Sequence, residues 1–165
     1  MTGTSINMSK IDIEIKILDD RIIKLWGPPT YQTDLAAAID LYACIDKPIK
    51  IKPGNMAQLL PSGISIHMNN NSMMAMILPR SGLGHKKGLV LGNTAGVIDA
   101  DYSGPILISV WNRNSVESKT DICISPGERI AQMIFLPIIR PNFKIVENFS
   151  FQNPRGEGGF GSTDK

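Results

Sequence analysis

Hydrophobic and polar residues alternate in short runs along most of this chain. In the clearest run, residues 11–17 (IDIEIKI), every second residue is isoleucine. Strict alternation over so short a stretch predicts a β-strand with one buried face. Further short apolar runs are expected to form strands, and they span residues 36–43, 56–60, 64–68, 73–78, 105–112, 121–125, 131–139 and 144–149.

Turn signals separate these runs. The chain holds 15 glycines and 11 prolines, and Pro-Ser-Gly at 61–63 and three asparagines at 69–71 are expected to be turns. Residues 81–87 are expected to form one short helical turn. The three alanines at the start of 36–43 favour a helix, but the run is too short to stand alone and prolines follow it. Many short strands with no βαβ alternation predict an all-β barrel or double-sheet roll.

The chain of 165 residues is expected to form one domain. We assign residues 11–150 to this β-barrel domain, 1–10 to an N-terminal extension and 151–165 to a flexible glycine-rich C-terminal lid. A net charge of +2 gives no reason to expect nucleic acid or a membrane as partner. No signal peptide is evident, so Cys44 and Cys123 are expected to be buried free thiols in a cytoplasmic protein.

The stretch 93–106 (NTAGVIDADYSGPI) places two carboxylates, Asp99 and Asp101, between Gly96 and Gly104. Its glycines and the β-prone segments on either side predict a hairpin held by strands. A carboxylate fixed at the root of such a hairpin is a candidate general base. The alternative is that both aspartates are ordinary turn residues that accept local amide hydrogen bonds.

Residues 79–88 (PRSGLGHKKG) are a candidate phosphate site. Arg80 can bind two oxygens at once, and Ser81 with Gly82 can donate from the side chain and the main chain. The spacing of a Walker loop is missing, and a basic surface turn is the alternative.

Residues 155–165 (RGEGGFGSTDK) satisfy GxGxxG literally, but only four residues remain after Gly161. A dinucleotide-binding fingerprint needs a following helix, so that interpretation fails. A disordered end is the default for such a tail. Its Arg155, Phe160 and Ser162 could nevertheless close over a phosphorylated ligand.

Residues 126–132 (PGERIAQ) predict a turn that runs into a strand. Glu128 and Arg129 are expected to pair with each other, and Gln132 is a candidate contact to a polar ligand. His67 and His85 are isolated, so no zinc site is predicted. Any metal is therefore expected to be oxygen-bound and to arrive with substrate phosphates, as magnesium does.

Five segments, AAAIDLYA, PRSGLG, GNTAGVIDADYSG, PGERIAQMIF and RGEGGFGS, resemble the five ordered motifs of the trimeric dUTP pyrophosphatases, the dUTPase family, in a bacterial-like form. The resemblance runs from about residue 11 to the end of the chain. It implies a distorted jelly roll or β-barrel (β-clip) that forms a homotrimer, with each site built from three chains. It also implies hydrolysis of dUTP to dUMP and pyrophosphate, which lowers dUTP and supplies dUMP for dTMP synthesis.

The resemblance also implies roles for single residues. Asp99 matches the residue that orients and deprotonates the water attacking the α-phosphorus. Asp40 matches the acid that meets Mg²⁺ through water, while the substrate phosphates mainly hold the ion. The remaining matches are substrate contacts: Asn93, with backbone near Val97, Ile98 and Leu107, for the uracil; Tyr102 for the deoxyribose; Arg80, Ser81, Gly82 and Gln132 for the phosphates; Arg155, Phe160 and Ser162 in the closing tail.

Two departures from the family pattern stand out. The first motif reads AAAID at 36–40 where a Ser-Ala-Gly core is usual, and the segment 112–126 is a few residues longer than the usual bacterial turn. A dCTP deaminase of the same fold is one alternative, but Ser109 occupies the position of its glutamate. A non-catalytic nucleotide-binding regulator is the other, and it would be favoured by loss of Asp99, Arg80 or the tail, all of which are present.

Overall fold

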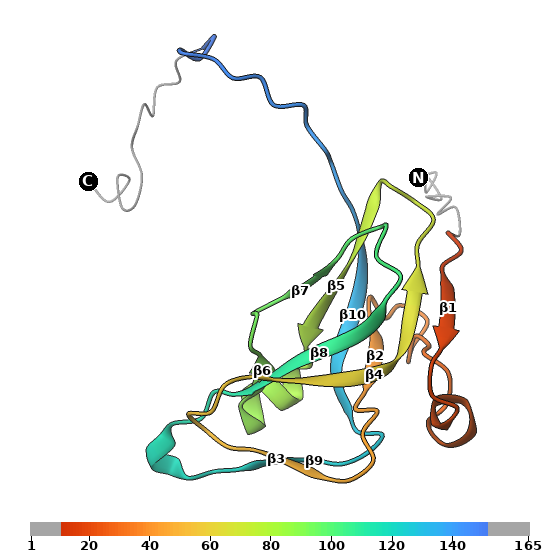
Figure 1. Ribbon diagram of the computed structural model, residues 1–165, viewed down its shortest axis with the longest axis vertical. Coiled ribbons are helices and arrows are strands. Elements are labelled where there is room, and N and C mark those ends of the chain that lie inside the picture. Colours follow the sequence, from red (N-terminus) through yellow and green to blue (C-terminus); the bar gives the residue numbers. More distant parts are fainter. Residues whose placement is uncertain (1–10, 152–165) are drawn as a thin grey trace, which may run out of the picture.

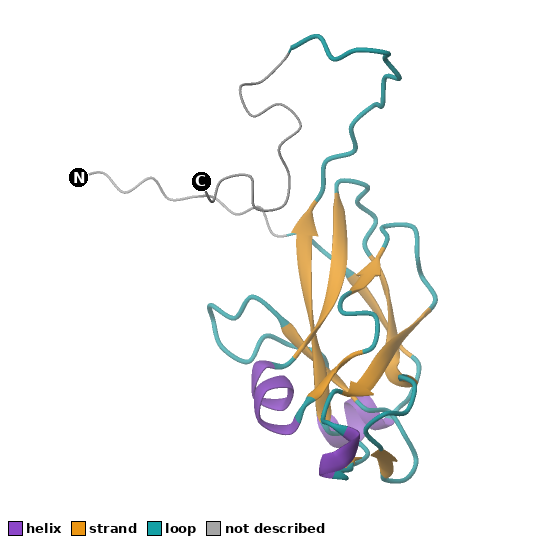
Figure 2. Ribbon diagram, turned by 90° about the vertical axis from the view of Figure 1, so that its left-hand side faces the viewer, coloured by secondary structure: helices purple, strands orange, loops and turns teal. Residues whose placement is uncertain are grey.

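Two four-stranded antiparallel sheets enclose one apolar core in the computed structural model, which describes residues 11–151 (Figures 1 and 2). The first sheet has the order β1-β4-β8-β6, the second β2-β10-β5-β7, and a two-stranded sheet pairs β3 with β9. The strands are β1 (Glu14–Ile17), β2 (Ile39–Tyr42), β3 (Ile49–Ile51), β4 (Gln58–His67), β5 (Met73–Pro79), β6 (Leu89–Leu91), β7 (Gly96–Ile98), β8 (Pro105–Asn112), β9 (Ile122–Ile124) and β10 (Arg129–Pro137). Short helical turns are η1 (Ile22–Trp26), η2 (Leu83–Lys87) and η3 (Val116–Ser118).

Strand β8 shows how the sequence pattern builds this core. Ile106, Ile108 and Val110 point inward and are at most 1% exposed, whereas Leu107 and Trp111 face outward. Successive side chains of a strand point to opposite faces, so alternation in the sequence becomes alternation of burial. The all-β, jelly-roll-like prediction is confirmed.

Most of the predicted elements are present. Runs 73–78 and 105–112 are strands β5 and β8, the alanine-rich run contains β2 and no helix, and η2 lies within 81–87. Strand β1 is shorter than the alternating run that predicts it. It begins at Glu14 because its partner β4 ends at His67, opposite Glu14.

The predicted turn at 61–63 is wrong, because β4 continues through it as one strand. The strand bulges here: Pro61 pairs with Leu107, and the next pair along joins Ser65 to Pro105. Gly63 has φ +78°, and a Cβ there would lie 2.8 Å from the Cys44 sulfur. Pro-Ser-Gly therefore bends a strand instead of ending it, since glycine accepts the left-handed conformation that a bulge needs.

The predicted strand at 144–149 is also wrong. Residues 138–151 form an extended arm that leaves the body of the molecule after β10 (Figure 1). Its large apolar side chains face solvent, and Phe143, Ile145 and Phe149 are 92%, 99% and 86% exposed. A strand needs a neighbouring edge to satisfy its backbone groups, and the arm pairs with no strand in the described part of this chain.

Cys44 and Cys123 are both free thiols, as predicted, but only Cys44 is buried. The outward position of Cys123 on the short strand β9 corrects the expectation that both are buried. Among the described residues, no helix is long and apolar enough to cross a bilayer.

The buried Cys44 thiol makes alkaline stability testable. Burial raises the pKa of this thiol from 9.0 to about 11, and the neighbouring Asp19 carboxylate adds to the shift. The folded state therefore holds its proton where the unfolded chain has lost it, and the free energy of unfolding falls as pH rises from 9 to 11. Denaturant melts should show that Cys44→Ala flattens this fall while Cys123→Ala leaves it unchanged. An equal slope in both variants would contradict the assignment.

Candidate active site

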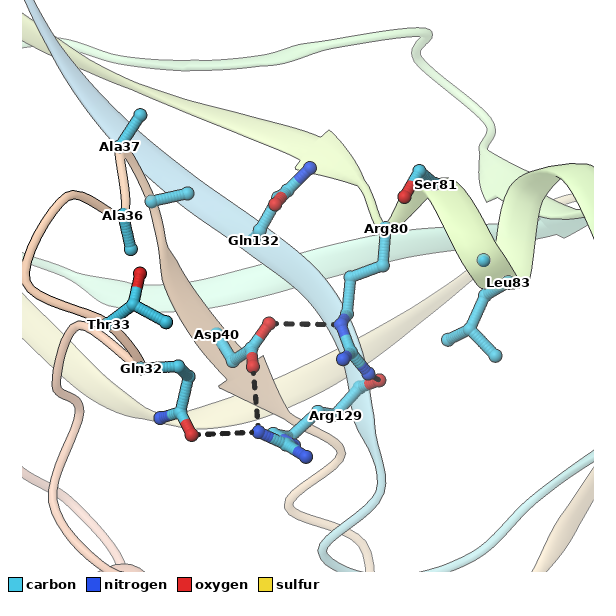
Figure 3. A pocket seen from close by; sticks show the side chains of 12 residues that line it. Gln32, Thr33, Ala36, Ala37, Asp40, Arg80, Ser81, Leu83, Arg129 and Gln132 are labelled. Carbon is cyan, nitrogen blue, oxygen red and sulfur yellow. Dashed lines mark hydrogen bonds and ion pairs between the residues drawn. The ribbon is translucent and has the colours of Figure 1, made fainter.

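A cavity of about 580 Å³ opens where β2, β5 and β10 meet the start of η2 (Figure 3). The loop before β2 forms its far wall. Its lining combines small side chains with two cations, and consists of Gln32, Thr33, Ala36, Ala37, Ala38, Asp40, Arg80, Ser81, Gly82, Leu83, Arg129 and Gln132.

Two arginines and one carboxylate form the charged part of this cavity. The Asp40 Oδ1 lies 2.9 Å from the Arg80 Nε, and the Asp40 Oδ2 lies 3.1 Å from the Arg129 Nη1. The Arg80 Nη1 also donates to the Arg129 carbonyl oxygen at 2.7 Å. Two guanidiniums against one carboxylate leave the cluster with a net charge of +1. A cavity with this excess favours an anionic ligand.

The cavity brings together five residues that the sequence singles out. Arg80 follows β5, Ser81 and Gly82 lead into η2, and Asp40 on β2 pairs with Gln132 on β10. The Gln132 side chain donates to the Pro79 carbonyl oxygen at 2.9 Å. The three strands therefore assemble one polar site from three distant segments.

Arg129 is the charged cavity residue that the sequence analysis did not place in the site. The predicted Glu128–Arg129 pair is wrong: Arg129 binds Asp40 and the Gln32 side chain, while Glu128 lies 3.6 Å from Lys87. Arg129 and Gln132 are three positions apart, so a regular strand would place them on opposite faces. A register shift between Arg129 and Ala131 in the pairing with β2 brings both to the cavity.

The stretch 93–106 is not the hairpin that its glycines predict. Strand β6 pairs with β8 in one sheet, whereas β7 pairs with β5 in the other. The chain thus crosses from one sheet to the other and back, and β7 and β8 are not paired with each other. Asp99 directly follows β7, where its carbonyl oxygen accepts the Tyr102 N–H at 3.1 Å.

Asp99 lies far from the charged cavity of its own chain. Ile98 pairs with Ala75 on β5, and Arg80 lies five positions further along the same segment. At about 3.3 Å per residue, the backbones of Asp99 and Arg80 are therefore about 16 Å apart. The cavity lining lacks the predicted base Asp99, Tyr102 as the predicted contact to the deoxyribose, and the residues predicted to read the uracil, Asn93, Val97, Ile98 and Leu107.

Tyr102 is folded back over its own turn. Its hydroxyl donates to the Pro105 carbonyl oxygen at 2.9 Å. A Cβ on Gly104 would lie 2.6 Å from that hydroxyl oxygen. Glycine at this position therefore leaves the space that the Tyr102 side chain occupies. Tyr102 is 42% exposed.

Comparison with known proteins assigns the chain to a family. The family model described as dUTPase matches residues 24–164. This chain belongs to the dUTPase family. It is 50% identical over 153 residues to the deoxyuridine 5'-triphosphate nucleotidohydrolase of Psychromonas ingrahamii, covering 93% of this chain and 97% of that protein. It is also 50% identical over 158 residues to the enzyme of the same name from Escherichia coli O45:K1, covering 96% and 99%.

Solved dUTPase structures share the fold. The dUTPase of Staphylococcus bacteriophage 80alpha, solved with dUPNHPP, superposes with a TM-score of 0.81 at 24% identity and covers 93% of this chain and 99% of its own. A variant of the dUTPase from phage phi11 of S. aureus, described with a structural Mg(II) ion, reaches 0.72 at 19% identity over 85% and 99%.

The residues of the dUTPase cavity do not fit a resident metal. Both carboxylate oxygens of Asp40 already face arginine nitrogens, and the surrounding charge is positive. Within residues 11–151, no group of three or more His, Cys, Asp or Glu side chains could hold an ion. A cation would need oxygen ligands from another source, such as the phosphates of a substrate.

Three dUTPase-like positions, Arg155, Phe160 and Ser162, lie outside the described residues. Their assignment to a closing lid, with its boundary at residue 151, remains a prediction from the sequence.

Proposed function

We propose that this chain is a dUTP diphosphatase, which hydrolyses dUTP to dUMP and pyrophosphate. The observation that carries the proposal is the 50% identity, over nearly the whole length of both chains, to proteins named deoxyuridine 5'-triphosphate nucleotidohydrolase. The anion-selective cavity around Arg80 and the exposed carboxylate of Asp99 supply the two chemical functions that this reaction needs. In a cell, the activity would keep dUTP low and provide dUMP for dTMP synthesis.

The proposed chemistry is a single displacement at the α-phosphorus. Asp99 orients a water molecule and accepts its proton as the water oxygen forms a bond to phosphorus. The bond between the α-phosphorus and the bridging oxygen breaks, and pyrophosphate leaves with that oxygen. Arg80, with donors from Ser81, Gly82 and Gln132, offsets the charge on the phosphate oxygens.

Magnesium is proposed to arrive with the triphosphate as part of the substrate. The cation would offset charge on the phosphate oxygens, which lowers the cost of expelling pyrophosphate. A direct bond from Asp40 to the ion is disfavoured because arginines occupy both of its oxygens.

Uracil is proposed to be read along strand β7. This strand is the edge of its sheet, so one side of its backbone has no strand partner among the described residues. The N–H and C=O groups that face this open side near Val97 and Ile98, with the backbone of Leu107 and the Asn93 side chain, can match the alternating donors and acceptors of the uracil edge. Cytosine reverses the polarity at two ring positions, and a mispaired buried group is costly.

The sugar is proposed to pack on Tyr102, whose position depends on Gly104. Gly104→Ala is expected to push the Tyr102 ring from its place, because the new Cβ overlaps the hydroxyl. We expect kcat/KM for dUTP to fall and the preference for dUTP over UTP to narrow by roughly 10-fold. Ser103→Ala, in the same turn, is the matched control. An unchanged dUTP/UTP ratio in Gly104→Ala would show that Tyr102 does not read the sugar.

A homotrimer is proposed as the active assembly, because the parts of the site do not meet within one chain. The separation of Asp99 from Arg80 calls for a second copy, and the outer surface offers places for it to dock. Leu59 on β4 and Leu107 and Trp111 on β8 form an exposed apolar face. The arm at 138–151, with its exposed phenylalanines, can reach a neighbour and find there the strand partner it lacks. The number three comes from the family resemblance.

Further parts of the proposal follow from the sequence. We place the enzyme in the cytoplasm, in keeping with its free thiols. Residues 151–165 are proposed as a lid in which Arg155 meets the phosphates, Ser162 adds a donor and Phe160 stacks on the base. No nucleic acid or membrane partner is proposed.

The test is pyrophosphate release from dUTP, dCTP, dTTP and UTP in the presence of magnesium. The expected result is release from dUTP with at least tenfold lower rates for the other three nucleotides. Deaminated product from dCTP would revive the deaminase alternative, for which Ser109 lacks the needed carboxylate. Tight binding of dUTP without turnover would instead favour the non-catalytic regulator.

A further inference from the structure

We propose that Thr94 is a positioning residue for the choice of nucleobase. Its strained backbone holds Asn93 and the start of β7 in one conformation, and this rigidity enforces the preference for uracil over cytosine. The inference rests on the proposed function and deepens it, because it names the residue that fixes the geometry of the base-reading segment.

Thr94 has an unusual backbone conformation. Within residues 11–151, three non-glycine residues have a positive φ: Asn69 at 44°, Lys119 at 49° and Thr94 at 64°. Asparagine tolerates this region, and Lys119 caps the end of η3, where a left-handed residue is common. Thr94 caps no helix, and a β-branched residue with a positive φ is an outlier. Strain of this kind collects at functional sites, where the surrounding structure maintains it.

Two overlapping turns contain the strained residue. The Thr94 N–H donates to the Leu91 carbonyl oxygen at 3.2 Å, and the Ala95 N–H donates to the Asn93 carbonyl oxygen at 2.6 Å. The second bond closes a three-residue turn centred on Thr94, and the positive φ makes it the rare, strained form of the γ-turn. Asn93 belongs to both turns, so its backbone is restrained from both sides.

The strain arises where the chain crosses from one sheet to the other. Strand β6 ends at Leu91 in the first sheet, and β7 begins at Gly96 in the second, so residues 92–95 alone make the crossing. Thr94 is exposed, and burial of its side chain therefore does not offset the strain. The pairing of β6 and β7 with their neighbouring strands maintains it.

Asn93 needs this restraint because its amide can face either way. An asparagine side chain presents an oxygen acceptor on one side and N–H donors on the other, and half a turn exchanges them. A mobile amide could therefore match uracil or cytosine. The Asn93 Nδ2 lies 3.6 Å from the place that a Cβ on Gly96 would take, so the amide lies over the start of β7. A stiff β-branched residue at 94 keeps the amide and β7 in a fixed relation, and a mispaired cytosine is then costly.

The test replaces Thr94 with glycine, which accepts a positive φ without strain. Thr94→Gly should raise the melting temperature by about 2–4 °C, because the strain is relieved. The same change should lower the dUTP/dCTP ratio of kcat/KM about tenfold, because the turn gains further conformations. Hydrogen exchange of the amides at 93–96 should become faster.

Two control variants separate strain from other effects of the substitution. Lys119→Gly makes the same backbone change at the end of η3, outside this crossing, and should keep the dUTP/dCTP ratio within about threefold. Thr94→Ala removes the hydroxyl and a methyl group but keeps the Cβ that confines the backbone, so it should also keep the ratio. An unchanged ratio in Thr94→Gly, a lower melting temperature, or an equal loss in Thr94→Ala would each overturn the inference.

A binding measurement separates this inference from the proposed function. The probes are dUPNHPP and its cytosine counterpart, titrated in EDTA so that turnover is not needed. The preference of the wild type for the uracil analogue should shrink about tenfold in Thr94→Gly. If the wild type releases no pyrophosphate from dUTP, the proposed function fails and this ratio still decides the inference. If the wild type shows no such preference, or Thr94→Gly keeps it in full, the inference fails whatever the reaction.

Discussion

Asp99→Asn is expected to lower the rate of pyrophosphate release from dUTP by a factor of about 10² to 10⁴, the usual contribution of a positioned general base. Asparagine keeps the shape of the side chain but cannot accept the proton of the attacking water. Because Asp99 is exposed and its side chain has no hydrogen-bond partner among the described residues, the substitution should leave the fold and its melting temperature unchanged. Rates should be measured by pyrophosphate release, and binding by titration with dUPNHPP.

Comparing the loss of turnover with the loss of ligand binding tests the role of Asp99. Binding of dUPNHPP should stay within about threefold of wild type, since the proposed base acts on the water and only weakly on the ground state. Asp101→Asn, two residues away in the same exposed turn, is the matched control and should retain most of the activity. If Asp101→Asn were the inactive variant and Asp99→Asn the active one, the base would be misassigned.

Mixed assemblies of two inactive variants are expected to regain activity. Asp99→Asn and Arg80→Ala should each be nearly inactive alone, since one lacks the proposed base and the other the proposed phosphate-binding cation. If Asp99 and Arg80 of each site come from different chains, random mixing in equal amounts leaves about a quarter of the sites intact, because each chain is suitable with a chance of one half. The measurement is pyrophosphate release after the two variants are unfolded and refolded together.

A second mixture is the control for this experiment. The double variant Asp99→Asn/Arg80→Ala, refolded with wild type in equal amounts, should also give about a quarter of the wild-type activity. A site built within one chain predicts a different pair of results: no activity in the first mixture and about half in the second. The separation of about 16 Å between Asp99 and Arg80 favours the first pair of results.

Several strands of this protein could be predicted because each one is a local pattern. The alternation at 105–112 sets the buried and exposed faces of β8 with no help from the rest of the chain. The extended conformation of the alanine-rich run around β2 could be predicted from its short length and from the prolines that follow it. The bulge at Gly63 could not be predicted, since Pro-Ser-Gly serves both as a turn and as a bend. Its outcome depends on the pairing of β4 with β8 and on the contact with Cys44.

The arm at 138–151 shows that a local sequence pattern can also predict a strand that does not form. Its apolar run has the composition of a strand, but a strand exists only where a partner edge satisfies its backbone. The run pairs with no strand edge within the described chain, so it stays extended and exposed. The predicted strand at 144–149 is wrong because strand formation depends on a partner edge, which the composition of the segment does not reveal.

The sequence by itself determined the all-β class, the candidate residues in their order along the chain and the family, because these are encoded in local spacing and in residue identity. Only the tertiary structure decided which candidates meet. The register shift in β10 turned Arg129 toward Asp40, and the crossing of 93–106 between sheets set Asp99 apart from Arg80. Both outcomes depend on how strands pair across long separations in the chain, and such pairings follow from packing of the whole core and not from any one segment.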